Sequence, residues 1–133
     1  MDTPLVLVVD DAPELRELVE RVLTRHGYRV RTVNDGDGAM RVLDQGGVDL
    51  LITDVVMPGR DGIEVLLDVQ EQYPQLPVIV MSGGGMFDPT LYLDNATGLG
   101  AHRTLRKPFT MGDLLDAVRE LVSPPASGGE SAG

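Results

Sequence analysis

Short apolar runs alternate along the chain with segments of helical period. The runs, rich in β-branched residues, predict strands at residues 5–9, 28–33, 48–53 and 77–81, with a weaker, more polar fifth at about 101–106. Apolar residues three and four positions apart predict helices over about 15–23, from residue 63 and over 114–122, and shorter ones near 39–43 and 91–96. The pattern therefore predicts five strands that alternate with five helices.

Helix boundary signals agree with this pattern. Asp11 and Thr110, each with an acid three positions on, are typical of N-caps with capping boxes, and Asp88 before Pro89 is a third start signal. Gly27 stands where the first helix should end. Alternating strands and helices predict an α/β protein whose parallel sheet is covered on both faces, because each crossover carries its helix back over the sheet.

Composition limits the chain to one domain. Its 133 residues, 42% hydrophobic and 24% charged, are typical of a soluble globular protein, and the apolar runs are too short to cross a bilayer. We expect a domain over 1–122 and a disordered tail over 123–133, which is rich in Ser, Pro and Gly. A net charge of −10 disfavours binding to nucleic acid or anionic membranes. The absence of cysteine and of a secretory signal is compatible with a cytoplasmic location.

Polar residues follow the predicted strands at their carboxyl ends, where open α/β sheets bind ligands. Asp10 and Asp11 follow the first strand, Asp54 the third, Ser82 the fourth and Lys107 the fifth. Taken singly, Asp11 is a good N-cap, Asp54 a turn residue and Ser82 a loop residue. Together they predict three carboxylates, a hydroxyl and an ammonium at one edge of the sheet.

Three adjacent carboxylates stay ionised together only if a cation neutralises them. Oxygen ligands without His or Cys favour a hard ion, and Mg²⁺ typically combines one or two carboxylates with a phosphate oxygen. Such a site suits phosphoryl transfer, with one carboxylate as the nucleophile. The Lys107 ammonium and the Ser82 hydroxyl would hold the phosphoryl oxygens that the metal does not.

Four motifs follow the strands in order: Asp10-Asp11, Asp54 to Gly62, Ser82, and Lys107-Pro108-Phe109. With these motifs, residues 4–122 resemble the receiver domains of two-component response regulators. The resemblance implies a flavodoxin-like (βα)₅ fold, a doubly wound three-layer sandwich with a five-stranded parallel sheet of order 2-1-3-4-5.

The resemblance also implies roles for single residues. Asp54 matches the phospho-acceptor, and Asp10 and Asp11 match the acidic pair that binds Mg²⁺ with it. The backbone carbonyl of Val56 matches a further metal ligand. No other cofactor is expected.

Ser82 matches the switch hydroxyl and Lys107 the lysine that pairs with the phosphoryl group, and the Lys107–Pro108 peptide is similar to one that is cis in the family. The chain departs from the family at Thr104, three residues before Lys107, where an aromatic switch residue is usual. The loop with glycines at 83–85 is longer than typical, and it is either a mobile lid or a solvent loop.

The expected function is a stand-alone response regulator. A histidine kinase or phosphotransfer protein would phosphorylate Asp54 with Mg²⁺, and the product would change affinity for a partner protein through the face of the fourth helix, fifth strand and fifth helix. The chain would be a monomer or weak dimer. It would not be an enzyme beyond slow self-catalysed phosphoryl transfer and autodephosphorylation.

Three alternatives stay open at this point. Thr104 is compatible with a receiver-like interaction module that phosphorylation does not control. A haloacid-dehalogenase-like phosphatase would need Asp-x-Asp after the first strand, where this chain has adjacent Asp10 and Asp11. A flavodoxin-like cofactor carrier would need a Ser/Thr/Gly loop there, and two aspartates would repel its phosphate.

Overall fold

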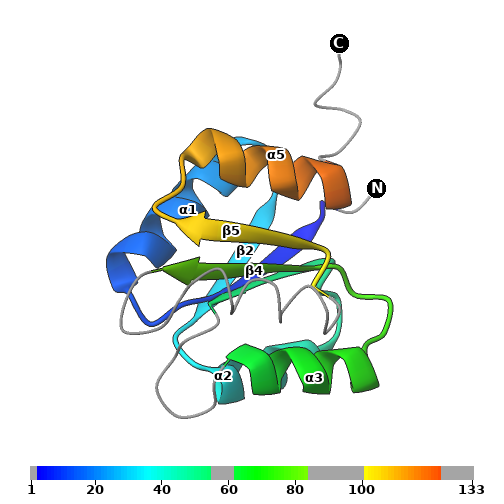
Figure 1. Ribbon diagram of the computed structural model, residues 1–133. Helices are drawn as coiled ribbons and strands as arrows, with labels where there is room; N and C mark the ends of the chain where they lie inside the picture. Colours follow the sequence, from blue (N-terminus) through cyan, green and yellow to red (C-terminus); the bar gives the residue numbers. More distant parts are fainter. Residues whose placement is uncertain (1–2, 55–61, 84–100, 124–133) are drawn as a thin grey trace.

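The computed structural model describes residues 3–54, 62–83 and 101–123. Its elements run in chain order as follows (Figure 1): β1 Leu5–Val9, α1 Pro13–Arg25, β2 Arg29–Val33, α2 Gly36–Gln45, β3 Leu50–Asp54, α3 Gly62–Gln72, β4 Val78–Gly83, β5 Arg103–Lys107 and α5 Met111–Leu121. All five predicted strands and four of the five predicted helices are present. The expected helix near 91–96, the start signal at Asp88, the carbonyl of Val56 and tail residues 124–133 lie outside the described residues.

The five strands form one parallel sheet of order β2-β1-β3-β4-β5, which confirms the predicted fold. One row across its middle joins Thr32, Val8, Ile52, Ile79 and Arg103. The outer position of β5 explains why that strand is more polar than its neighbours, since an edge strand is not covered on every side.

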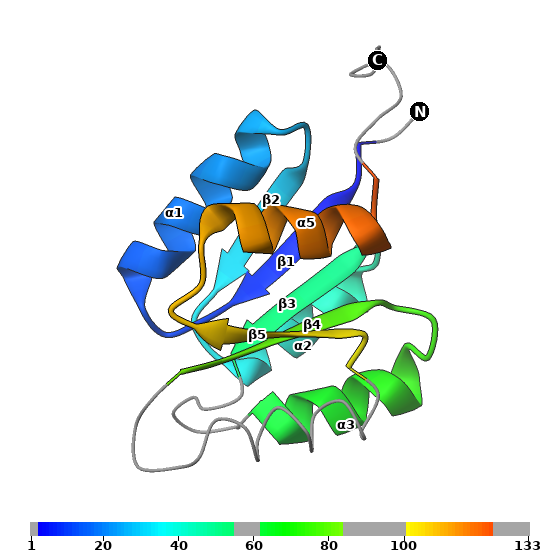
Figure 2. The same cartoon turned by 45° about the horizontal axis from the view of Figure 1, so that its top comes forward.

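Helices cover both faces of the sheet, with α1 and α5 on one side and α2 and α3 on the other (Figure 2). Each face of the sheet has its own hydrophobic core, and successive residues of β1 point to opposite faces. Val6 and Val8 pack with Leu23 and Leu114, whereas Leu7 packs with α2 and α3. Every residue of β1 is buried. Each such side chain contributes roughly 1.5–3 kcal/mol, so the sheet centre is a rigid base for its ends.

Helix α1 starts differently from the prediction. Its N-cap is Ala12, not Asp11, and Pro13 occupies the first helical turn. The Ala12 N–H is satisfied by the Asp10 carboxylate at 2.8 Å. The predicted Asp11 cap is wrong because proline has no N–H to be capped and the neighbouring aspartate serves the backbone instead.

The other boundary predictions can be compared directly. Thr110 caps α5, with its Oγ1 accepting from the Asp113 N–H at 2.9 Å and both halves of the capping box formed, as predicted. Gly27, with φ of 96°, follows the end of α1 as expected. Asp35, which the sequence reasoning passed over, caps α2 by accepting from the Gly38 N–H at 2.8 Å.

The Lys107–Pro108 peptide bond is cis, as the resemblance implied. It directly follows the last residue of β5. Among the described residues, no helix is long and apolar enough to cross a membrane.

Candidate functional site

Three carboxylates meet at the carboxyl ends of β1 and β3. Oxygen atoms of Asp10, Asp11 and Asp54, here called the acidic cluster, lie within 4.8 Å of one another. Asp10 is fully buried and Asp54 is 6% exposed, whereas Asp11 is exposed. The cluster therefore reaches water on the side of Asp11, so that a ligand can enter there.

Lys107 is the chain's only lysine, and it joins two members of the cluster. Its Nζ donates to Asp10 Oδ2 at 2.7 Å and to Asp54 Oδ2 at 2.8 Å. Burial lowers the pKa of Lys107, but the hydrogen bonds and charges of Asp10 and Asp54 outweigh that effect and raise the pKa above its ordinary value. The ammonium therefore stays charged at neutral pH and partly offsets the repulsion between the two carboxylates.

The backbone around Asp10 is fixed from three directions. Its Oδ1 accepts from the Ala12 N–H, its own N–H donates to the Val33 carbonyl at 3.2 Å, and its carbonyl accepts from Arg16 Nη1 at 2.7 Å. These contacts leave Asp10 Oδ2 directed at Lys107. A buried carboxylate held this firmly is prepared for a ligand before the ligand arrives.

Arg16 is the contact that sequence reasoning missed. It sits on α1 six residues after Asp10, where it looks like an ordinary polar position beside the apolar stripe. The only signal was its place in the first turn of a helix that follows the strand end closely, and many surface arginines share that position.

The remaining predicted residues lie at or near the same edge. Ser82 is paired in register with Arg106 and follows Met81, the register partner of Asp54, so its backbone is at the carboxyl end of the sheet. Thr104 is paired with Val80 and is three positions before Lys107. An odd separation along a strand places Thr104 and Lys107 on opposite faces of β5.

The donors of the acidic cluster fit a hard divalent cation. All three are carboxylate oxygens, two of them are buried, and they are close enough to share one ion. Lys107 would either compete with such an ion for the carboxylates or complement its charge, because the ammonium already contacts two of the three carboxylates.

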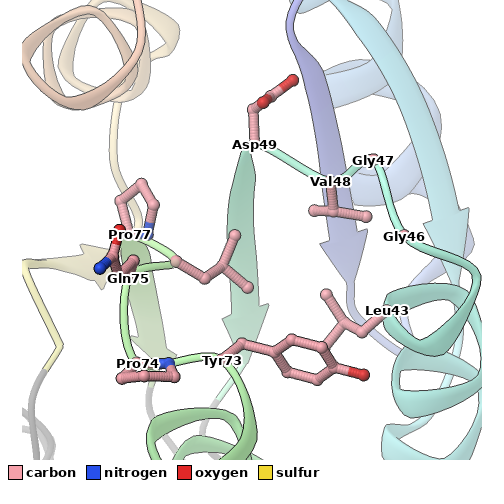
Figure 3. A pocket seen from close by; sticks show the side chains of 10 residues that line it. Leu43, Gly46, Gly47, Val48, Asp49, Tyr73, Pro74, Gln75 and Pro77 are labelled. Atoms are coloured by element: carbon pink, nitrogen blue, oxygen red, sulfur yellow. The ribbon is translucent and has the colours of Figure 1, made fainter.

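A separate cavity of about 380 Å³ lies at the opposite, amino end of the sheet (Figure 3). It is lined by the segments that lead into β3 and β4, residues 46–49 and 73–77, together with Leu43. Figure 3 shows the side chains of Leu43, Val48 and Tyr73 around it. None of the described residues that line it belongs to the acidic cluster, so this cavity is separate from the acidic cluster.

The fold and the site together define a class of protein. A parallel α/β sheet with three carboxylates and one lysine at its carboxyl end is compatible with a divalent cation at that end. The chain belongs to the response regulator receiver domain family, whose model matches residues 6–119. Domains of this family work in two-component systems, where they interact with kinases and downstream effectors.

Curated relatives are longer than this chain. It is 36% identical over 132 residues to the DNA-binding transcriptional regulator NtrC of Bradyrhizobium sp. (strain RP501 Parasponia), covering 94% of this chain and 27% of the relative. It is 37% identical over 117 residues to the transcriptional regulatory protein TcrA of Mycobacterium tuberculosis, covering 87% of this chain and 45% of the relative. The similarity therefore concerns less than half of either relative.

Solved structures agree in fold along most of the chain. A response regulator receiver domain protein of Clostridium thermocellum matches with a TM-score of 0.82 and 28% identity, over 89% of this chain and 93% of that one. The chemotaxis protein CheY4 of Vibrio cholerae matches with a TM-score of 0.81 and 29% identity, over 91% of this chain and all of that one.

Proposed function

We propose that the chain is a phosphorylation-dependent switch in which Asp54 accepts a phosphoryl group from a histidine kinase or phosphotransfer protein. The observation that carries this proposal is the placement of Lys107 Nζ, within 2.8 Å of both Asp10 Oδ2 and Asp54 Oδ2. An ammonium beside a buried carboxylate can accompany the extra negative charge that phosphorylation brings.

The transfer needs little covalent chemistry from the protein. An Asp54 carboxylate oxygen attacks the phosphorus atom, the new O–P bond forms, and the P–N bond to the donor histidine breaks. Mg²⁺, when bound, would neutralise charge on the transferring oxygens. Asp10, Asp11 and Asp54 would hold it, with the Val56 carbonyl as a further ligand by family resemblance.

The residues around Asp54 would then carry the change outward. Lys107 would exchange its contact with the carboxylate for one with the phosphoryl group, and Ser82 would supply a hydroxyl to the same group. Lys107 is the last residue of β5, and α5 follows shortly after it in the chain. The face that includes β5 and α5 is therefore the proposed surface for a downstream protein. Thr104 replaces the usual aromatic residue and lies on the face of β5 opposite Lys107. The change at the phosphorylated site would therefore reach the partner surface without an aromatic switch residue at this position.

We place the receiver domain at residues 1–122 and the protein in the cytoplasm, working as a monomer or weak dimer. Self-catalysed phosphoryl transfer and slow autodephosphorylation would be its only reactions. Because the curated relatives are longer, the stand-alone form and the absence of nucleic-acid binding stay predictions. The mass of the protein in its native cells and a binding assay with double-stranded DNA test these two points.

Intact mass tests the central proposal. The protein is incubated with a small phosphodonor and Mg²⁺, and we expect one added phosphoryl group that is absent from Asp54→Asn and from the reaction without metal. Asp116→Asn on the exposed side of α5 is the matched control and should be modified like the wild type. An unmodified wild type, in a reaction that modifies a known receiver domain, would favour the non-phosphorylated interaction module instead.

A further inference from the structure

Three arginines from three different elements line one hollow beside β2. They are Arg16 of α1, Arg31 of β2 and Arg41 of α2, and the hollow, here called the arginine hollow, has a volume of about 470 Å³. Its size is within the usual range for a small-molecule site. The gathering is unexpected in a chain with a net charge of −10 and only ten arginines.

The arginine hollow is lined by three arginines and one acid, so its lining keeps a net positive charge. Arg16 donates to the carbonyl of Asp10 at 2.7 Å, and Arg31 donates to the side-chain oxygen of Gln45 at 2.8 Å, so both partners are neutral acceptors. Within the described parts of the chain, no carboxylate forms an ion pair with Arg16, Arg31 or Arg41. The single acid of the lining, Asp35, already accepts the Gly38 N–H as the cap of α2.

The lining also indicates which kind of anion would fit. Among the described residues that line the arginine hollow, none is aromatic, so it offers no surface on which a nucleobase would stack. Guanidinium groups bind phosphate oxygens in a bidentate manner. A planar carboxylate satisfies one such fork at a time, whereas a tetrahedral phosphate presents oxygens in several directions and can meet forks that come from three elements.

We propose that the arginine hollow is a binding site for a small phosphate-bearing anion. This inference goes beyond the phosphorylation of Asp54 and does not rest on it. The two sites nevertheless touch through Arg16, which lines the arginine hollow and also holds the carbonyl of Asp10. Arg31 and Arg41 are exposed and lie outside the acidic cluster, so variants at these two positions test the arginine hollow alone.

The test uses inorganic pyrophosphate as the probe, with unphosphorylated, metal-free protein at constant ionic strength. Calorimetry measures affinity, and amide chemical shifts locate the site. We expect saturable binding, shifts that centre on β2 and the start of α2, and an affinity that falls about tenfold in Arg31→Gln and in Arg41→Gln.

Arg21→Gln is the matched control. Arg21 is exposed on α1, near Glu17 and Glu20 and outside the arginine hollow, so its loss removes the same charge from the chain. Pyrophosphate affinity of this variant should equal that of the wild type. The proposal is overturned by non-saturable binding, by an equal loss of affinity in Arg21→Gln, or by citrate that binds as tightly as pyrophosphate, since each would mean that the protein responds only to charge.

Discussion

The two ends of the sheet use the same five strands for opposite purposes. At the carboxyl end, buried Asp10 and Asp54 face each other across a single ammonium, that of Lys107. At the amino end, polar groups fasten the chain: Asp49 Oδ2 accepts the Leu5 N–H at 2.8 Å, and the Tyr73 hydroxyl donates to Asp44 beside an open cavity. Charge is concentrated where a ligand would bind, and the opposite end is held by ordinary hydrogen bonds.

The strand centres do not explain this difference. β1 and β3 are buried along their whole length and pair in register from Val6 with Leu50 to Val9 with Thr53. The two ends differ in a few residues that lie at the ends of the strands or close beyond them. The functional character of the sheet therefore depends on a few positions that contribute little to its core.

The largest effect should come from Lys107→Met in the absence of divalent metal. The variant leaves Asp10 and Asp54 buried together without a counter-charge. We expect the free energy of unfolding to fall by about 3 kcal/mol. This value is at the low end of the range for breaking a buried ion pair, because the lysine side chain is 25% exposed. Urea unfolding measures the change. Millimolar Mg²⁺ should restore part of the loss, and an unaltered stability without metal would contradict the account.

High pH should weaken the same contact without a mutation. Because the pKa of Lys107 is raised above 10.5, its stabilising effect is complete below that pH and is lost as pH rises through the higher folded-state value. Burial also raises the pKa of Tyr28, so stability is lost in the same range and direction there. Lys107→Arg keeps Tyr28 and the positive charge, and its stability should fall less steeply between about pH 9 and 11, as followed by thermal unfolding.

The two ends should respond differently to the loss of a carboxylate when Mg²⁺ is titrated. Asp10→Asn removes a charged ligand from the acidic cluster, and we expect the affinity for Mg²⁺ to fall by about tenfold or more. Asp49→Asn removes the same charge at the amino end and should leave the affinity unchanged. Calorimetry compares the two variants, and an equal loss in both would show that only net charge matters.

The smallest effects are expected at the amino end. Asp49→Ala removes the acceptor of the part-buried Leu5 N–H and should lower the free energy of unfolding by about 1 kcal/mol. Tyr73→Phe removes an exposed hydrogen bond to Asp44 and should lower the free energy of unfolding less than Asp49→Ala does. Neither change should alter phosphoryl uptake. A larger loss than that of Lys107→Met would reverse the comparison between the two ends.

Much of the fold follows from the sequence because each signal acted locally. The first strand was predicted at its observed bounds, since an apolar run ended by two aspartates has one reasonable interpretation. Strands β3 and β4 begin later than predicted, and they extend further at their carboxyl ends because the ladder continues to the pairs of Asp54 with Met81 and Gly83 with Lys107. That extension depends on a neighbouring strand, which a local pattern does not contain.

The acidic cluster was also predictable, since parallel strands bring their carboxyl ends to one edge. What the sequence could not indicate was how the residues share their partners. Asp11 was expected to cap α1, but Asp10 accepts the Ala12 N–H instead. Arg16 and the other two arginines of the arginine hollow come from separate elements, so only the folded chain brings them together.

The single lysine gives this protein an unusual chemical property. Apart from the α-amino group, Lys107 is the one primary amine in the chain, so an amine-selective reagent would label one side chain. That amine is bound to two carboxylates and only a quarter exposed, and its rate of acylation depends on how often it leaves them. The rate of labelling is therefore a reporter of the state of the acidic cluster that needs no substitution in the protein.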